Sequence, residues 1–283
     1  MGPARSPSLS ERTTTFLSAA QRHLGEELCF AGPIPLECVL PPHFNDPGLV
    51  SAKDGRKFVM RLARPNLKNG EDGRVCRELV NLAFFEQGGS YALRSPVEQW
   101  RFHDRCRQAR LAVPAMVYAD ANGSLVEFID GTNVSILLAR QRSTGPMHRY
   151  LDDIRVNQRA GLILGDRHCC NAIEDRDGRI WQIDADVRIE GPCTRELEIC
   201  QAIFYSLHAL GGSEEGIDVA LEFLATAHAD YAMRYVKRFL AAFRSFKGSA
   251  AYADGKYAAV VPCISRILDR FPTPRKETPR LRR

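Results

Sequence analysis

The chain has 283 residues, 45% of them hydrophobic and 26% charged, so it can bury a sizeable core and is not disordered as a whole. Its net charge of +5 suits an anionic ligand, and so mild an excess gives no reason to expect nucleic acid as a partner. No apolar run is long enough to span a membrane, and nine scattered cysteines without a Cys-x-x-Cys pair are typical of a reduced compartment, which predicts a cytoplasmic protein.

The first fifty residues are rich in helix-breaking and turn-forming residues. Residues 1–15 contain many Ser, Thr, Pro and Arg, which predicts a mobile arm, and a short helical pattern follows from Phe16 to Leu28. Prolines between Phe30 and Asp54 predict short edge strands and loops. Neither Gly-x-Gly-x-x-Gly nor Gly-x4-Gly-Lys-Ser/Thr occurs, and Phe44–Gly48 is the candidate substitute for a glycine-rich phosphate loop.

A hairpin is predicted from Leu49 to Leu62, with its turn at Asp54-Gly55. Because side chains alternate along a strand, the second strand has a polar face and an apolar face. The polar face carries Lys57, Val59 and Arg61, and the apolar face carries Phe58, Met60 and Leu62.

A helix is predicted at about residues 74–87, with an apolar stripe that includes Val75 and Leu79. Glu78 lies beside this stripe and points toward the protein, where a carboxylate needs a cationic partner. We expect that partner to be Arg61; a solvated Glu78 is the alternative.

Residues 91–111 are dense in arginine and contain Trp100 and Phe102. A solvated amphipathic helix packed against a small β-rich lobe is the favoured interpretation, and a nucleic-acid contact is the alternative. A second hairpin, with its turn at Asn122-Gly123, is predicted for residues 113–129, and Asp130-Gly131 would then link two lobes.

Three polar residues stand out between Leu162 and Asp186. Asp166 ends an apolar run, Asn171 follows five residues later, and a hairpin with its turn at Asp175–Gly178 leads to Asp184. The hairpin would bring these oxygen ligands together, as Mg²⁺ requires. A solvated, Asp-rich hairpin is the alternative.

Most of the remaining sequence has helical periodicity. The pattern begins at Asn133, and Thr194 is the expected N-cap of a long helix. Helices are predicted at residues 146–164, 194–210, 217–227, 229–246 and 263–271, followed by a basic tail at 272–283.

The segment Gly165-Asp166-Arg167-His168-x-x-Asn171, with Asp184 after it, resembles the catalytic loop and metal-binding segment of the protein-kinase-like superfamily. It is similar to the forms found in aminoglycoside phosphotransferases and phosphoinositide-3-kinase relatives. The resemblance implies an α+β, two-lobed fold: a small β-rich N-lobe with one helix (16–130) and a mostly helical C-lobe (131–271), with ATP between them.

The resemblance also implies roles for the residues of this segment. Asp166 would be the base that accepts the proton of the acceptor hydroxyl. Asn171 and Asp184 would hold Mg²⁺. His168 would stabilise the loop or the transferring phosphoryl group, unless it only bonds a nearby backbone carbonyl.

In the N-lobe, the resemblance places Arg61 where the family has an ATP-contacting lysine. Arginine is also a permanent cation but is not interchangeable with lysine, so Lys57 or Lys68 could instead supply the charge. Glu78 would fix Arg61. The implied adenine contacts are Val59 and the hinge residues Glu127 and Ile129.

The implied activity is ATP- and Mg²⁺-dependent transfer of a phosphoryl group to a hydroxyl of a protein or a small molecule. Only nine residues separate Asp184 from Thr194, too few for a usual activation segment, which suits a constitutively competent enzyme. One candidate is a small-molecule kinase; another is a compact protein kinase of the kind that bacteria deliver into host cells. The alternatives are a catalytically inactive nucleotide-binding scaffold and an AMP-transferring enzyme.

Overall fold

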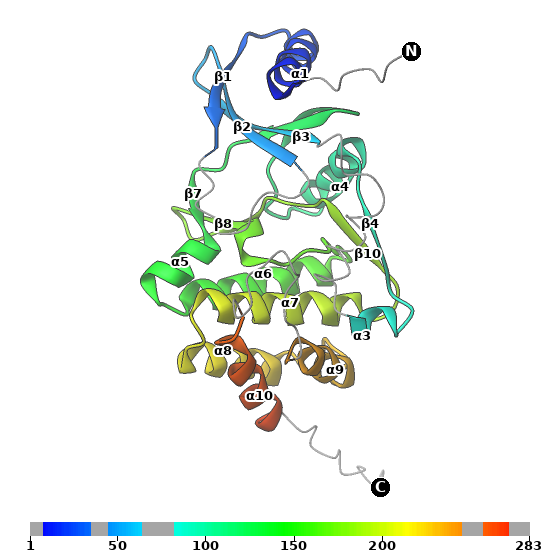
Figure 1. Cartoon of the computed structure of the whole chain (residues 1–283), viewed down its shortest axis with the longest axis vertical. Coiled ribbons are helices and arrows are strands. Elements are labelled where there is room, and N and C mark those ends of the chain that lie inside the picture. Colours follow the sequence, from blue (N-terminus) through cyan, green and yellow to red (C-terminus); the bar gives the residue numbers. More distant parts are fainter. Residues whose placement is uncertain (1–7, 35–44, 64–81, 245–256, 272–283) are drawn as a thin grey trace, which may run out of the picture.

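The computed structural model describes residues 8–34, 45–63, 82–244 and 257–271. Figure 1 shows a β-rich lobe at one end and a helical lobe at the other. A five-stranded antiparallel sheet forms the first lobe, in the order β1-β2-β3-β6-β5. Its strands are β1 (Leu28–Pro33), β2 (Asn45–Ala52), β3 (Lys57–Ala63), β5 (Met116–Asp120) and β6 (Gly123–Glu127).

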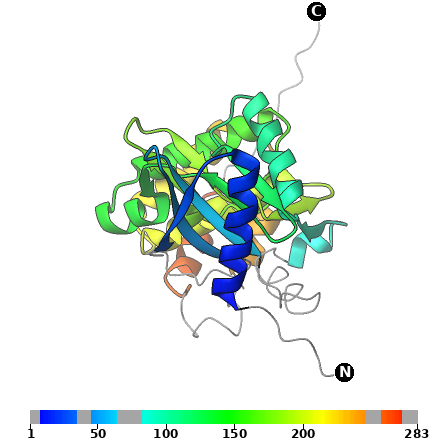
Figure 2. The same ribbon diagram turned by 90° about the horizontal axis from the view of Figure 1, so that it is seen from above.

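Helix α1 (Leu9–Leu24) crosses one face of this sheet, as the view from above shows (Figure 2). Its Phe16 and Ala20 pack with the apolar side chains of β3, which confirms the predicted alternation along that strand. The helix begins earlier than expected, so residues 9–15 are helical and do not belong to a mobile arm. The reason is a capping box, in which the side chains of Ser8 and Glu11 bond each other's backbone N–H groups.

A second helix, α4 (Pro96–Gln108), packs against β5 and β6. The sequence predicted this helix and its packing. Among the described residues, this lobe contains α1 and α4, and both overlap segments that the sequence predicted to be helical. Ser95 and Glu98 form its capping box, and Pro96 occupies the first turn, where its missing N–H costs nothing.

The helical lobe surrounds α7 (Thr194–Ala209), whose residues 196–207 are all buried. The helices around it confirm the predicted pattern, although Cys193 and not Thr194 is the N-cap of α7. These helices are α5 (Val134–Gln141), α6 (Gly145–Arg159), α8 (Glu214–Thr226), α9 (Met233–Arg244) and α10 (Val260–Asp269). Their apolar faces form the largest core of the molecule.

Two small sheets lie between the lobes. The first contains the predicted hairpin, β8 (Ala172–Asp175) and β9 (Ile180–Gln182), and β7 (Gly131–Asn133) pairs with β8. In the second, β10 (Val187–Glu190) pairs with β4 (Ser90–Leu93). The chain thus fastens the segment after Asp184 to a strand more than ninety residues earlier in the sequence.

Some expectations are corrected or fall outside the described residues. Asn45–Gly48 is the first half of β2, so this part of the candidate phosphate loop is strand. Of the helix predicted at 74–87, only α3 (Leu82–Phe85) is described. None of the described helices is long and apolar enough to cross a membrane. Cys29, Cys106, Cys193, Cys200 and Cys263 form no disulfide within the described residues.

Candidate active site

The catalytic loop begins with a glycine that the fold requires. Gly165 has φ +103°, and a side chain there would clash with the carbonyl of Val187. The next residue, Asp166, is held at both carboxylate oxygens. The His168 N–H donates to Oδ1 at 3.1 Å, and the Asn171 side-chain amide donates to Oδ2 at 3.1 Å. The predicted pair of Asp166 and Asn171 therefore comes together directly.

The surroundings of Asp166 favour its protonated form more than water does. Burial, together with the negative charge of Asp184, raises the pKa of Asp166 to about 6, against the two hydrogen bonds from His168 and Asn171. A carboxyl group with this pKa is ionised at neutral pH and can still take up a proton readily, which are the properties of a general base.

Asp184 lies at the end of the hairpin and faces Arg61 from the opposite lobe. The Arg61 guanidinium donates to Asp184 Oδ1 at 3.0 Å and to Asp186 Oδ1 at 2.9 Å. Burial would raise the pKa of Asp184, but the charge of Arg61 and the hydrogen bonds from Arg61 and Asp186 together outweigh it and hold that pKa below its ordinary value. The backbone of Ile183 connects this segment to the catalytic loop, since its N–H bonds the Asn171 carbonyl at 3.0 Å.

Arg61 projects from the middle of β3 and is only 9% exposed. Its described partners are the two aspartates and the Ile183 carbonyl. Glu78, its predicted partner, and Lys68, an alternative cation, lie outside the described residues. Lys57, the other alternative, is exposed and lies 6.0 Å from the ring centre of Phe128.

His168 serves the loop itself. Its Nδ1 accepts the Cys170 N–H at 3.1 Å, which caps the short 3₁₀ turn Cys169–Asn171. Its ring lies 4.1 Å from that of Tyr205 on α7, and the residue is 7% exposed. Of the two roles expected for His168, this geometry matches stabilisation of the loop.

The predicted hinge residues follow β6. Glu127 is exposed, and its side chain accepts the Ala115 N–H at 3.2 Å. Ile129 is buried, and its N–H has no backbone acceptor within the part of the chain that the structure describes. Val59 lies opposite Val126 of β6 and is half-buried.

Asp186 was missed by the sequence prediction, which chose Asp184 alone. Two residues apart, these aspartates share the same arginine. His103 of α4 was also missed: it is 1% exposed, and its Nδ1 lies 3.1 Å from the Pro114 carbonyl. Burial, and then the charge of Arg61, lowers the pKa of His103 to about 4, so it is neutral beside the site.

A buried glutamate of α7 holds the start of the catalytic loop. Glu198 Oε1 accepts the N–H groups of Leu164 and Gly165, each at 2.8 Å, and Nε of Arg167 at 3.0 Å. Both Glu198 and Arg167 are fully buried. An ion pair so deep contributes little net stability unless its other bonds are also made, but it fixes the geometry of the loop.

Arg94 connects the two segments that carry the site aspartates. Its guanidinium donates to the Leu164 carbonyl at 3.1 Å, before the catalytic loop, and to the Ala185 carbonyl at 2.8 Å. It also bonds the carbonyls of Ile163 and Val187. The sequence suggested that residues 91–111 were solvated, yet Arg94 is 9% exposed, because these carbonyls satisfy its donors.

The acidic groups present suit a metal that binds jointly to protein and ligand. The described residues contain no group of three or more His, Cys, Asp or Glu that could hold a metal by itself. Asn171 and Asp184 offer an amide and a carboxylate oxygen, and Mg²⁺ is commonly held by one or two such groups together with substrate phosphates. The residues present therefore fit Mg²⁺ brought with a nucleotide.

A small antiparallel sheet, a helical lobe, and a Gly-Asp-x-His-x-x-Asn loop with a second aspartate between them define a protein-kinase-like fold. No family model matches the sequence, and no curated protein does.

Two solved structures are similar to the chain. One is Rio2 kinase from Chaetomium thermophilum, in an ADP/Mg²⁺-phosphoaspartate complex: 11% identity over 94% of this chain and 81% of that one, TM-score 0.43. The other is Rv3197 from Mycobacterium tuberculosis, in complex with erythromycin: 17% identity over 92% and 81%, TM-score 0.38. At these TM-scores neither similarity adds weight to the fold assignment, which follows from the sheet, the lobes and the loop.

Proposed function

We propose that the protein is an ATP- and Mg²⁺-dependent phosphotransferase that acts on a hydroxyl group of a protein or a small molecule. The observation that carries this proposal is the arrangement around Asp166. Its carboxylate accepts a hydrogen bond from Asn171, and burial together with the negative charge of Asp184 raises its pKa to about 6. Phosphoryl transfer needs such a base, oriented beside acidic and amide oxygens, more than it needs covalent chemistry from the protein.

The roles of the residues follow from their positions. Asp166 orients the acceptor hydroxyl and takes its proton. Asn171 and Asp184 would hold Mg²⁺, which, when bound, neutralises the charge of the nucleotide phosphates. Arg61, which already bonds Asp184 and Asp186, lies where it can turn to a phosphate oxygen. His168 keeps the loop closed through Cys170.

Adenine would lie against Val59 and the backbone after β6. The Ile129 N–H, which has no backbone acceptor among the described residues, is the group we assign to a ring nitrogen. Glu127 contributes through its backbone, because its side chain is turned to Ala115.

One observation favours a second candidate, an inactive nucleotide-binding scaffold. Arg61 occupies the acidic pair Asp184/Asp186 and neutralises the carboxylates that would face a metal. If the nucleotide does not displace this ion pair, the protein binds ATP without transferring a phosphoryl group.

Labelled ATP separates the candidates. We expect the wild type, with MgCl₂ and cell lysate, to transfer label from γ-labelled but not α-labelled ATP, and Asp184→Asn to transfer none. Asp177→Asn, at an exposed hairpin turn, is the matched control and should behave as wild type. Transfer of α label would indicate AMP transfer and overturn the proposal. No transfer of either label, while ATP still raises the melting temperature, would favour the scaffold.

A further inference from the structure

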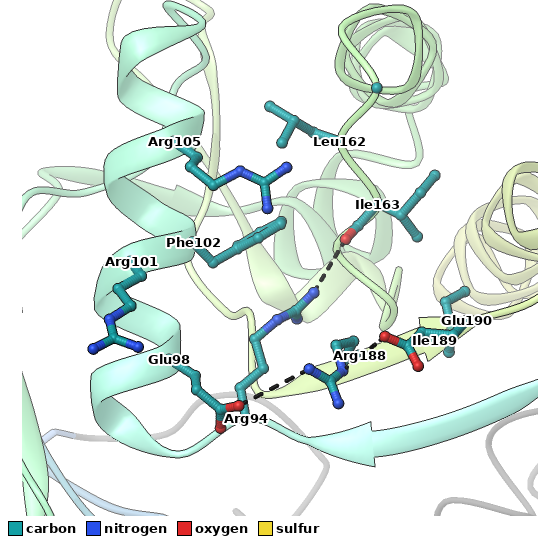
Figure 3. A pocket seen from close by; sticks show the side chains of 11 residues that line it. Arg94, Glu98, Arg101, Phe102, Arg105, Leu162, Ile163, Arg188, Ile189 and Glu190 are labelled. Atoms are coloured by element: carbon teal, nitrogen blue, oxygen red, sulfur yellow. Dashed lines mark hydrogen bonds and ion pairs between the residues drawn. The ribbon is translucent and has the colours of Figure 1, made fainter.

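A cavity lies away from Asp166 and Asp184, between α4 and β10. Its volume is about 460 Å³, and it is partly open to solvent. Four arginines and two glutamates line it, and a smaller apolar part is formed by Phe102, Leu162, Ile163 and Ile189 (Figure 3). Positive charge therefore exceeds negative charge in a cavity that also offers apolar surface.

The two glutamates are already engaged. Glu98 accepts the backbone N–H and the hydroxyl of Ser95 in the capping box, both at 2.8 Å. Its other oxygen lies 3.9 Å from the Arg188 guanidinium, and Glu190 lies 3.3 Å from the same side chain. Arg188 is thus the one arginine of the cavity that forms ion pairs within the described ranges, and both glutamates of the cavity are its partners.

The other three arginines lack such partners. Arg101 and Arg105 are one helical turn apart on α4 and are exposed, and neither side chain makes a hydrogen bond or an ion pair within the described ranges. Arg94 gives its side-chain hydrogen bonds to carbonyl groups and forms no ion pair with a described carboxylate. Its guanidinium is stacked 4.1 Å from the centre of the Phe102 ring.

Figure 3 shows Arg105 extending from α4 toward Leu162, with the Phe102 ring and Arg94 beside it. A guanidinium presents paired donors that match two oxygens of a phosphate group. A phosphate monoester carries a charge of roughly −1.5 to −2 near pH 7, which suits several unneutralised arginines better than the single charge of a carboxylate. The apolar wall can contact the organic group that bears the phosphate.

We propose that this cavity is a binding site for a phosphate monoester carried on an apolar or aromatic group. Arg105 binds the phosphate, and Phe102, Leu162 and Ile189 contact the organic part. Arg94 contributes positive charge without leaving its carbonyl partners. The same chemistry occurs in a phosphorylated protein side chain and in a free phosphorylated metabolite. The site does not depend on the proposed phosphotransferase activity.

Methyl NMR on the full chain tests the site, because isoleucines lie both in this cavity and next to Asp184 in the candidate active site. Ile163 and Ile189 line the arginine cavity, and Ile183 precedes Asp184. With isoleucine δ1 methyl labelling, we expect phenyl phosphate to shift Ile163 and Ile189 in a saturable manner, more tightly than inorganic phosphate does, and to leave Ile183 unchanged at concentrations that saturate the other two.

Single substitutions on α4 supply the matched comparison. Arg105→Gln should weaken phenyl phosphate about tenfold or more, as expected for loss of a charged hydrogen bond. Arg107→Gln, on the same helix but outside the cavity, should leave affinity within about twofold. Both side chains are exposed, so the fold should persist, which a thermal melt of each variant checks.

Three results would show that the cavity does not bind a phosphate monoester as proposed. No saturable shift at about 10 mM phenyl phosphate, a shift of Ile183 alone, or equal weakening by both substitutions would overturn the site. A short peptide containing phosphotyrosine distinguishes the sources: tighter binding than phenyl phosphate identifies a protein ligand, and equal or weaker binding identifies a small phosphorylated compound. Loss of γ-label transfer in Asp184→Asn has no bearing on any of these shifts, so the site and the proposed activity fail independently.

Discussion

Arginine at position 61 changes how the acidic groups of the site are held. A lysine is a single point charge on a flexible stem, whereas a guanidinium can bond two carboxylates at once. Here the same Arg61 nitrogen lies 3.0 Å from Asp184 and 2.9 Å from Asp186. The charge of Arg61 offsets the mutual repulsion of the two carboxylates, and a phosphate group would have to compete with them for it.

The raised pKa of Asp166 makes a prediction about both activity and stability. The folded-state pKa of about 6 lies above the ordinary value of 3.8, so the folded protein holds this proton more tightly than the unfolded chain does. Below the unfolded value, the group costs no stability. As pH rises from about 4 to about 6, the cost appears, and it persists at neutral pH.

Asp166→Asn, which is always uncharged, should therefore abolish phosphoryl transfer and increase the free energy of unfolding at pH 7.5 by about 1–3 kcal/mol. The gain should shrink toward zero as pH approaches 4. Urea unfolding of wild type and variant across this pH range measures it. Asp177→Asn, at an exposed turn, should alter neither quantity; an Asp166→Asn protein that is less stable at pH 7.5 than wild type would show that the carboxylate is stabilised by its surroundings.

At the scale of elements, three parts of the chain hold the catalytic loop from different sides. Glu198 of α7 bonds its beginning, His168 and Tyr205 support its middle, and Arg94 fastens the segment before it to the strand after Asp184. The loop lies on the rigid core of the helical lobe, which is the arrangement that keeps catalytic groups in place.

Glu198 offers the sharpest test of this support. Glu198→Ala should reduce the free energy of unfolding by about 3–5 kcal/mol, because it leaves the buried Arg167 unpaired and two backbone N–H groups without an acceptor. Chemical denaturation measures the change. Glu222→Ala, at an exposed position of α8, should lose less than about 0.5 kcal/mol. Equal losses in the two variants would contradict the role of Glu198.

Elements with strong local signals were predictable. The hairpins with turns at Asp54-Gly55, Asn122-Gly123 and Asp175–Gly178 form as expected, because these turns and the alternating side chains are local properties. The capping box Ser8-x-x-Glu11 was also present in the sequence, and a search for it would have found the true start of α1.

The parts of the site that could not be predicted depend on contacts between distant segments. The sequence around Arg94 has the composition of a solvated helix. Only the folded chain brings the carbonyls of Ile163, Leu164 and Ala185 to its guanidinium. Likewise, Arg61 and Asp186 are far apart in the sequence, and nothing local to either indicates the other. The spacing of Asp166, Asn171 and Asp184 was enough to locate the site, but not to identify what surrounds it.

At the scale of the whole molecule, the short connection after Asp184 matters most. Strand β10 begins at Val187, pairs at once with β4, and is followed within a few residues by α7. The segment that often regulates protein-kinase-like enzymes is here part of a sheet. We therefore infer that the acidic pair stays in place without a separate activating event.

The proposed function requires that residues 166, 171 and 184 form a working phosphotransferase site. The most direct test is to add wild type or Asp166→Asn to cell lysate with ATP and MgCl₂ and compare the phosphorylated products by mass spectrometry. We predict at least one phosphorylated species that the wild type produces and Asp166→Asn does not. The same phosphorylated species with both proteins, in equal amounts, would contradict the account.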